Sequence, residues 1–173
     1  MEKKTSLFSH SLLWGAILGI ILVVYSLILY FLDQSTNKGL GYVTWIIIIV
    51  CLFYAMKSYR DSVNQGTLSY GNAFVIGLLV AIIAGFISSV FTYIQFRFIS
   101  PEIIDKMLQM TEDKLMSKGM SDDMIEKSIE MSKKFMTPII MSIMGFIMTV
   151  IIGGILSLII AAIAKKDPET SVA

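Results

Sequence analysis

The sequence predicts an all-α, polytopic membrane protein with four transmembrane helices and an amphipathic helical hairpin between the third and the fourth. Hydrophobic residues make up 55% of the 173 residues and charged residues only 16%. A soluble domain of this length could not bury so much apolar surface. Four stretches contain no Asp, Glu, Lys or Arg, and each is long enough for a helix to cross hydrocarbon: 5–32, 39–56, 62–96 and 135–164.

Helices are the expected form of these stretches because a helix satisfies its own backbone hydrogen bonds in lipid. At this length we expect one membrane domain, residues 1–173. The first span is predicted at about residues 11–32. Lys3 and Lys4 before it would also suit a signal peptide. However, the apolar core is longer than such a peptide needs and no A-x-A cleavage site follows, so a retained helix is expected.

The second and third spans are predicted at about residues 42–56 and 70–98. Ser69 is a suitable N-cap for the third span. Aromatic side chains lie at or near both ends of the second span, as the interfacial belts of membrane helices prefer. These are Tyr42, Trp45, Tyr54 and Tyr59.

The segment at about 101–135 is expected to form a water-exposed helical hairpin. Ser100 and Pro101 suit the start of its first helix, and Gly119 suits the end. Eight acidic residues and six lysines nearly balance, and each helix carries one apolar stripe. The stripes are Ile104, Leu108 and Leu115, and then Met124, Met131 and Phe135. Thr137 then caps the fourth span, at about 138–164.

Lysine and arginine in short loops predict the orientation. Six of them fall on one side of a four-helix arrangement, which places both termini in the cytoplasm: Lys3, Lys4, Lys57, Arg60, Lys165 and Lys166. The short loop on the other side has only Lys38. The hairpin, with its lysines and Arg97, then faces outward. This placement runs against the rule, but the rule applies less strictly to longer segments.

Small residues recur at intervals of four on three of the spans. Such ladders let helix backbones approach closely in a membrane, either within one chain, the favoured interpretation, or between two copies of a homodimer. The helix-packing candidates are Gly15, Gly19, Gly77, Ala81, Gly85, Gly145, Thr149, Gly153, Ser157 and Ala161.

Ten of the twelve methionines lie between Met107 and Met148. Two M-x-x-M pairs, Met107 with Met110 and Met141 with Met144, would offer thioether ligands to Cu(I). No histidine or cysteine accompanies them, so we expect an adaptable apolar or partner-binding surface and no metal site.

Enzyme chemistry finds no support in the sequence. His10 is the only histidine, and Cys51, the only cysteine, lies in an apolar run. No acid pair, metal-ligand spacing or phosphate loop can be assembled, so we expect no enzyme, no cofactor and no catalytic residue. The net charge of +1 gives no basic excess that would favour nucleic acid.

Five segments together resemble a bacterial membrane family known as domain of unknown function 4199. They are Lys57-Ser58-Tyr59-Arg60-Asp61, the run from Gly66 to Phe74, Ile99-Ser100-Pro101-Glu102, the run from Lys134 to Pro138, and the run from Ala161 to Pro168. The resemblance covers nearly the full length. It implies a small multi-pass protein of the inner membrane, and it carries over no catalytic or binding residue.

Two functions follow as hypotheses. The first is a non-enzymatic protein of the lipid bilayer that works by association, with itself as a homo-oligomer or with another membrane or envelope protein. The alternative is a subunit of a small transporter or channel, which would need oligomers because four helices enclose little space.

Overall fold

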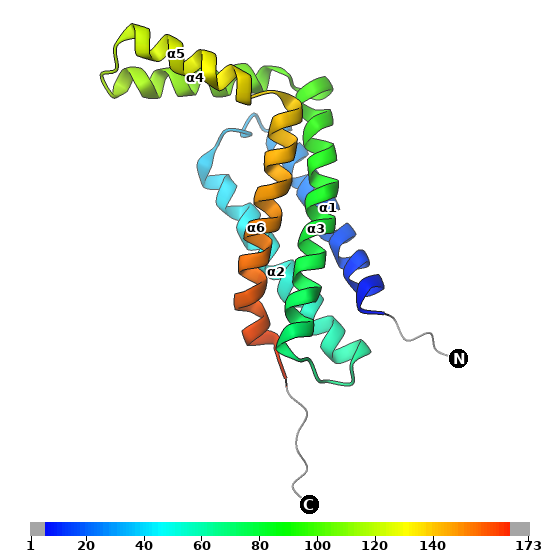
Figure 1. Cartoon of the computed structure of the whole chain (residues 1–173). Helices are drawn as coiled ribbons and strands as arrows, with labels where there is room; N and C mark the ends of the chain where they lie inside the picture. Colours follow the sequence, from blue (N-terminus) through cyan, green and yellow to red (C-terminus); the bar gives the residue numbers. More distant parts are fainter. Residues whose placement is uncertain (1–5, 167–173) are drawn as a thin grey trace, which may run out of the picture. The chain divides into compact units, whose positions relative to one another are not determined.

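The computed structural model describes residues 6–166, without the side chain of Lys38. Residue contacts divide the chain into two compact units, Met1–Ser88 with Phe146–Ala173, and Ser89–Gly145. Figure 1 labels the six α-helices along the chain. Their bounds, with those of two short π-helices, are α1 Leu7–Phe31, α2 Lys38–Ser58, η1 Tyr59–Val63, α3 Tyr70–Ile94, η2 Gln95–Ile99, α4 Glu102–Ser117, α5 Asp122–Phe135 and α6 Pro138–Ala164.

The all-α architecture and the four spans are confirmed. Four helical segments are long and apolar enough to cross a membrane: Leu7–Phe31, Gly39–Val63, Tyr70–Ile99 and Pro138–Ala164. The chain is therefore a multi-pass membrane protein, with α4 and α5 forming the hairpin between the last two spans.

The predicted starts of the first two spans were wrong, because polar side chains cap both helices earlier in the sequence. The Ser6 hydroxyl accepts a hydrogen bond from the Ser9 backbone N–H at 3.2 Å, so α1 begins at Leu7 and not near residue 11. Asn37 Oδ1 accepts from the Gly39 N–H at 2.9 Å, so α2 begins at Lys38 and not near residue 42.

Two of the predicted caps are present and one is not. The Ser69 hydroxyl accepts from the Asn72 N–H at 3.3 Å, and the Thr137 hydroxyl accepts from the Ile140 N–H at 3.4 Å. Ser100, by contrast, is buried, and its hydroxyl donates back to the Gln95 carbonyl at 3.5 Å. Ser100 ends the π-helix η2, and its backbone N–H also donates to the Gln95 carbonyl. Pro101 therefore takes the N-cap position of α4.

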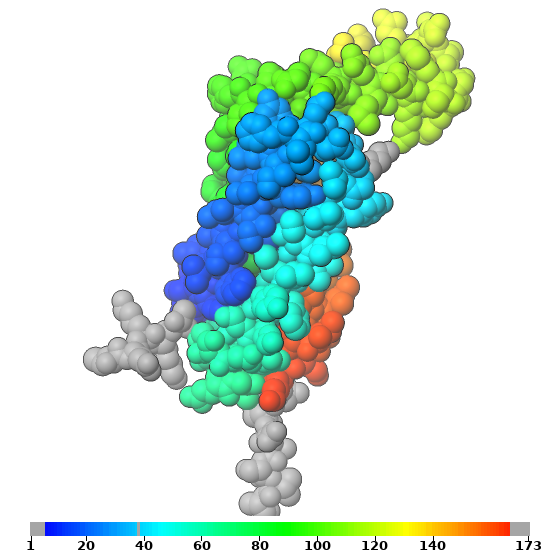
Figure 2. Space-filling view, turned by 180° about the vertical axis from the view of Figure 1, so that it is seen from behind, coloured from blue at the N-terminus to red at the C-terminus, as the bar shows by residue number. Residues whose placement is uncertain are grey.

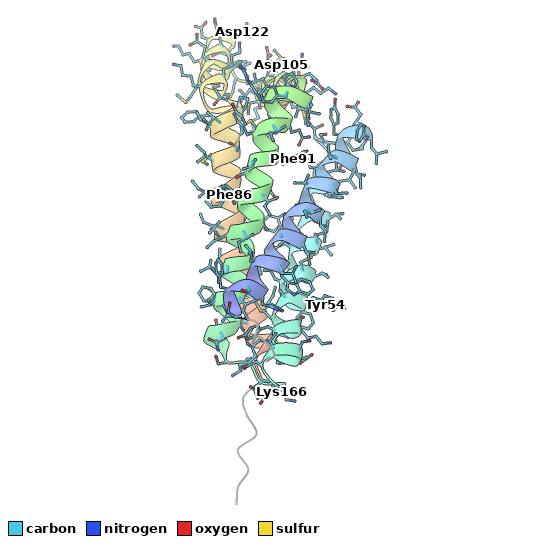
Figure 3. All side chains as sticks on the ribbon, turned by 90° about the vertical axis from the view of Figure 1, so that its right-hand side faces the viewer. Tyr54, Phe86, Phe91, Asp105, Asp122 and Lys166 are labelled. Carbon is cyan, nitrogen blue, oxygen red and sulfur yellow. The ribbon has the colours of Figure 1, made fainter. Side chains whose placement is uncertain are left out.

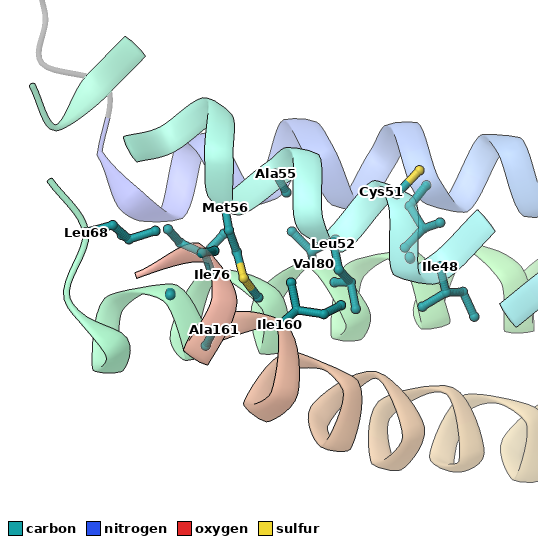
Figure 4. Packing of buried hydrophobic residues seen from close by; sticks show 14 residues of the cluster. Ile48, Cys51, Leu52, Ala55, Met56, Leu68, Ile76, Val80, Ile160 and Ala161 are labelled. Atoms are coloured by element: carbon teal, nitrogen blue, oxygen red, sulfur yellow. The ribbon is translucent and has the colours of Figure 1, made fainter. Parts of the chain in front are cut away.

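The first unit is built around α3. Figure 4 shows side chains of α2, α3 and α6 meeting in one cluster, including Leu52, Met56, Ile76 and Ile160. Leu52, Met56 and Ile76 have no exposed surface. On another face of this unit α1 and α2 lie side by side (Figure 2).

A short clamp joins the end of α6 to the loop before α3. Leu68 and Lys166 form an antiparallel bridge, in which Leu68 N–H donates to Lys166 O at 2.8 Å and Lys166 N–H donates to Leu68 O at 2.9 Å. Arg60 Nη1 also donates to the Ala164 carbonyl at 3.2 Å. The clamp therefore supplies partners to backbone groups at the end of a span, where the helix has none of its own.

In the second unit α4 and α5 pack against each other as the predicted hairpin. Ile103 on α4 and Ile125 on α5 are the buried residues of these two helices. Gly119 turns the chain between them with φ of 72°, a conformation that glycine adopts without a steric penalty.

Candidate functional site

The two glycines of α1 lie against α3. A Cβ added at Gly15 would come within 2.6 Å of Ile83 Cβ, and one added at Gly19 within 2.9 Å of Ile87 Cβ. Real Cβ atoms do not approach this closely, so each glycine admits a branched side chain of α3 that any larger residue would displace. These two ladder residues are used for packing between helices of the same chain.

Gly77 has the closest surroundings among the glycines of α3. An added Cβ there would collide with the Ser157 hydroxyl of α6 and would lie 2.5 Å from Met56 Cε of α2. Ser157 is fully buried and its hydroxyl donates to the Gly153 carbonyl at 2.6 Å, so its hydrogen bond stays within its own helix. Three helices meet at this glycine.

Two further contacts join α3 to α6. A Cβ added at Gly153 would collide with the Ala81 side chain, and one added at Gly85 would lie 3.3 Å from Thr149 Cγ2. Ala161, the last small residue on α6, has no exposed surface and belongs to the cluster of Figure 4. This part of the α6 ladder is therefore occupied by the chain's own α3.

Gly145, at the start of the same ladder, has a different environment. It is exposed, and an added Cβ would meet no heavy atom of the described residues within 4 Å outside its own helix. The large residues on the other side of α6 are exposed as well, as expected for a face in contact with lipid. They are Ile147, Ile151, Ile155 and Ile159.

The structure reveals a polar contact inside the first unit that sequence reasoning missed. His10 is 6% exposed, and its Nε2 lies 2.9 Å from the Ala55 carbonyl oxygen of α2. Because a carbonyl only accepts, Nε2 carries the proton of this hydrogen bond. The Tyr59 ring lies edge-on at 5.2 Å from the imidazole, and it is half-buried against the apolar cluster of the first unit. The signal in the sequence was His10 itself, the one histidine of the chain, in the first charge-free stretch.

Ligands for a metal are not assembled in the part of the chain that the structure describes: residues 6–166 contain no group of three His, Cys, Asp or Glu that could hold an ion. Each M-x-x-M pair has one half-buried and one exposed member, with Met110 and Met144 exposed. That these methionines bind no Cu(I) stays a prediction.

The hairpin has a groove of about 550 Å³ between α4 and α5. Ile125, which is 5% exposed, and Ile129 contribute its apolar part. Four carboxylates surround these isoleucines, against a single lysine, Lys133. The carboxylates are Glu112 on α4 and Asp122, Glu126 and Glu130 on α5. The groove therefore combines a negative rim with an apolar floor, an arrangement that suits a segment with basic and apolar side chains.

The family described as "Protein of unknown function (DUF4199)" matches residues 13–166. The chain belongs to this family. No curated protein and no solved structure matched the chain in the same comparisons. The family resemblance expected from the sequence is thus confirmed, and the family's description supplies no activity and no site residue.

The region matched to DUF4199 contains every ladder residue and the whole hairpin groove. His10 lies three positions before it.

Proposed function

We propose that this DUF4199 protein is a non-enzymatic membrane protein that works by association, and that the groove of its hairpin receives a basic, partly apolar segment of another membrane or envelope protein. The observation that carries the proposal is the groove's composition, four carboxylates around Ile125 and Ile129. Association with a second copy remains part of the proposal, as an outcome of the test.

The interior of the first unit favours association over transport. Large side chains fill the space between the spans: Leu18, Leu52, Met56, Ile76 and Val80 are each at most 1% exposed. A path for a solute through one chain would need polar groups or water in that interior. The transport alternative therefore requires a pathway between several copies, as a subunit of a larger assembly.

For the cellular setting we propose the inner membrane of a bacterium, with both termini in the cytoplasm. The support is the basic residues near the ends of α2 and α6, Lys57, Arg60, Lys165 and Lys166. Lys3 and Lys4, which point the same way, lie outside the described residues. In this orientation the groove is presented on the outer side of the membrane, to periplasmic or membrane-embedded partners.

The test is photo-crosslinking of the full-length protein in native membranes. A photoreactive amino acid replaces Met116, an exposed residue of the groove, and in a matched control it replaces Ile155 on the exposed face of α6. We expect a discrete protein adduct from position 116, mapped to a segment containing Lys or Arg. The double variant Glu126→Lys/Glu130→Lys should abolish that adduct, because it places like charges in contact.

An adduct from position 116 that survives the charge reversal would contradict binding through the groove. An adduct of twice the chain's mass would assign the association to a second copy. Flux of ions or solutes through liposomes that contain only this protein would support the transport alternative instead.

A further inference from the structure

The hairpin has a second surface, on the other side from the groove. On α5 the residues Met124, Met131 and Phe135 fall within about 40° of one another at 100° per residue. They are 56%, 62% and 63% exposed, so they do not serve the contact with α4. Lys127 and Lys134 border this stripe on the helix surface.

Three of the four acidic residues of α5 lie away from this stripe. Asp122, Glu126 and Glu130 follow each other at intervals of four and centre about 160° from the apolar stripe. They line the groove, which confirms that they share one side of the hairpin. Lysine and acid are therefore largely separated around α5, with two exceptions: Lys133 lines the groove, and Asp123 lies about 20° from Lys134 around the helix.

On α4 the separation is partial, because Asp113 lies about 20° from Lys106 around the helix. Lys106, Met110 and Lys114 form a series at intervals of four on one side. Met110 is 46% exposed. Glu112, which lines the groove, lies roughly 160° from Met110 around the helix. Because α4 and α5 are antiparallel neighbours, their lysine-bearing sides form one continuous surface opposite the groove.

We name this surface the lysine–methionine face. Its members are Lys106, Met110, Lys114, Met124, Lys127, Met131, Lys134 and Phe135.

The connections of the hairpin hold it at a membrane boundary. Only Ser100 and Pro101 separate η2 from α4, and only Met136 and Thr137 separate α5 from α6. Two residues span at most about 7 Å, so the base of the hairpin cannot move far from the ends of the two spans. Within the second unit, α4 and α5 run across the last turns of α3 and the first turns of α6 (Figure 1).

Within the second unit, the lysine–methionine face is turned toward the turns of α3 and α6 that belong to this unit. Figure 3 labels Asp105 and Asp122, one acid from each helix, at the end of the second unit remote from the spanning turns of α3. The acidic side therefore points away from the last turns of α3 in this unit, and the opposite side points toward them. Apolar side chains bordered by lysines are the composition of helices that lie in the headgroup layer, where lysine stems extend along apolar surface and their ammonium groups reach phosphate.

We infer that the hairpin lies on the lipid surface, with the lysine–methionine face docked against anionic headgroups and the acidic groove open to water. Anionic lipid is the occupant that fits, because four lysines border the apolar side chains of this face against two carboxylates, Asp113 and Asp123, which leaves the face with a net positive charge. The inference does not depend on the groove binding a partner. It also gives the lysines of the lysine–methionine face a role other than setting the orientation of the protein in the membrane.

The test measures which side of α5 meets lipid in the full-length protein. In a Cys51→Ala background, Met131→Cys and the matched control Glu126→Cys each receive an environment-sensitive fluorophore. The proteins are reconstituted into vesicles of phosphatidylcholine with or without phosphatidylglycerol. We expect the label at 131 to be severalfold less accessible to aqueous iodide, and more quenched by spin-labelled lipid, than the label at 126, with a larger difference in phosphatidylglycerol.

The electrostatic part is tested by the variant Lys106→Gln/Lys114→Gln/Lys127→Gln/Lys134→Gln. Each lysine near an anionic surface contributes roughly a fivefold preference for docking. The variant should therefore lose most of the protection at position 131. If it does not fold, as judged by circular dichroism and elution volume, raising the salt concentration on the unsubstituted chain should expose the label in its place.

Equal accessibility of the two labels in phosphatidylglycerol vesicles would overturn the inference. So would greater protection at position 126. Protection at 131 that persists in detergent and disappears on dilution of the protein would also overturn it, because the face would then be covered by a second copy.

Discussion

Gly145 and Gly153 lie on the same helix, two steps of a four-residue ladder apart, and a larger side chain would meet different surroundings at each. At Gly153 an added Cβ would collide with Ala81. At Gly145 it would meet no heavy atom of the described residues within 4 Å beyond its own helix. In lipid the hydrophobic effect does not favour burial of a small residue. Close backbone contact is therefore the reason for glycine at position 153, and it does not explain the glycine at position 145.

We therefore expect Gly153→Ile to destabilise the protein, with a cost of about 1–3 kcal/mol from overpacking. Gly145→Ile is the matched control, because it makes the same substitution at an open position and should leave the melting temperature in detergent unchanged. Ile155→Leu, on the exposed face of α6, should also be neutral. The measurement is thermal unfolding followed by intrinsic fluorescence, read beside size-exclusion profiles.

A Gly153→Ile protein that melts like the unsubstituted chain would show that α6 does not pack on α3 through this ladder. A protein that keeps its melting temperature but elutes as a smaller species would assign the ladder to contact between copies.

At the scale of elements, the end of α6 depends on a segment distant in sequence. Its last turn has carbonyls without intrahelical partners. Arg60 supplies one donor to Ala164, and the Leu68–Lys166 bridge supplies two backbone hydrogen bonds. Figure 3 shows Lys166 at the end of the first unit where this clamp lies. The clamp thereby ties the fourth span to the loop that precedes the third.

A pair of truncations tests the clamp. Ending the chain after Ala164 removes both bridge hydrogen bonds but keeps the acceptor of Arg60. Each backbone hydrogen bond contributes about 0.5–1.5 kcal/mol, so a lower melting temperature is expected. Ending the chain after Lys166 keeps the bridge and should leave the melting temperature unchanged. Equal melting of the two truncated proteins would show that the bridge does not stabilise the bundle.

At the scale of the whole molecule, four spans put the two termini on one side of the membrane. The hairpin then lies on the other side, because it connects the third and fourth spans. Which side faces the cytoplasm depends on the basic loops. The rule applies mainly to short loops, so the six lysines of the longer hairpin count for less than the basic residues beside the termini and in the loop between α2 and α3.

Reporter fusions after Ala173 test this orientation. A reporter that is active only in the cytoplasm should be active there, and a periplasm-dependent one should be silent. The same pair inserted at Gly119, in the turn of the hairpin, should give the reverse result. Periplasmic activity at Ala173 would contradict the proposed topology.

Much of this architecture was predictable from the sequence, because the bilayer sets a minimum length for every span and requires each helix to satisfy its own backbone hydrogen bonds. Charge-free runs located the four helices, and α6 has the predicted bounds, 138–164. The helix starts at Leu7 and Lys38 were missed, because the prediction followed the apolar pattern. The helices begin instead where Ser6 and Asn37 cap the first backbone N–H groups.

Tertiary structure decided the rest. Intervals of four identified Gly77 and Gly153 as close-packing positions, but periodicity is the same whether the neighbour is Ser157 of the chain itself or another copy. Likewise, the stripe of Met124, Met131 and Phe135 was visible in the sequence, whereas the groove opposite it exists only once α4 and α5 lie antiparallel. The physical reason is that a helix fixes which of its own residues share a face, and only packing fixes what that face meets.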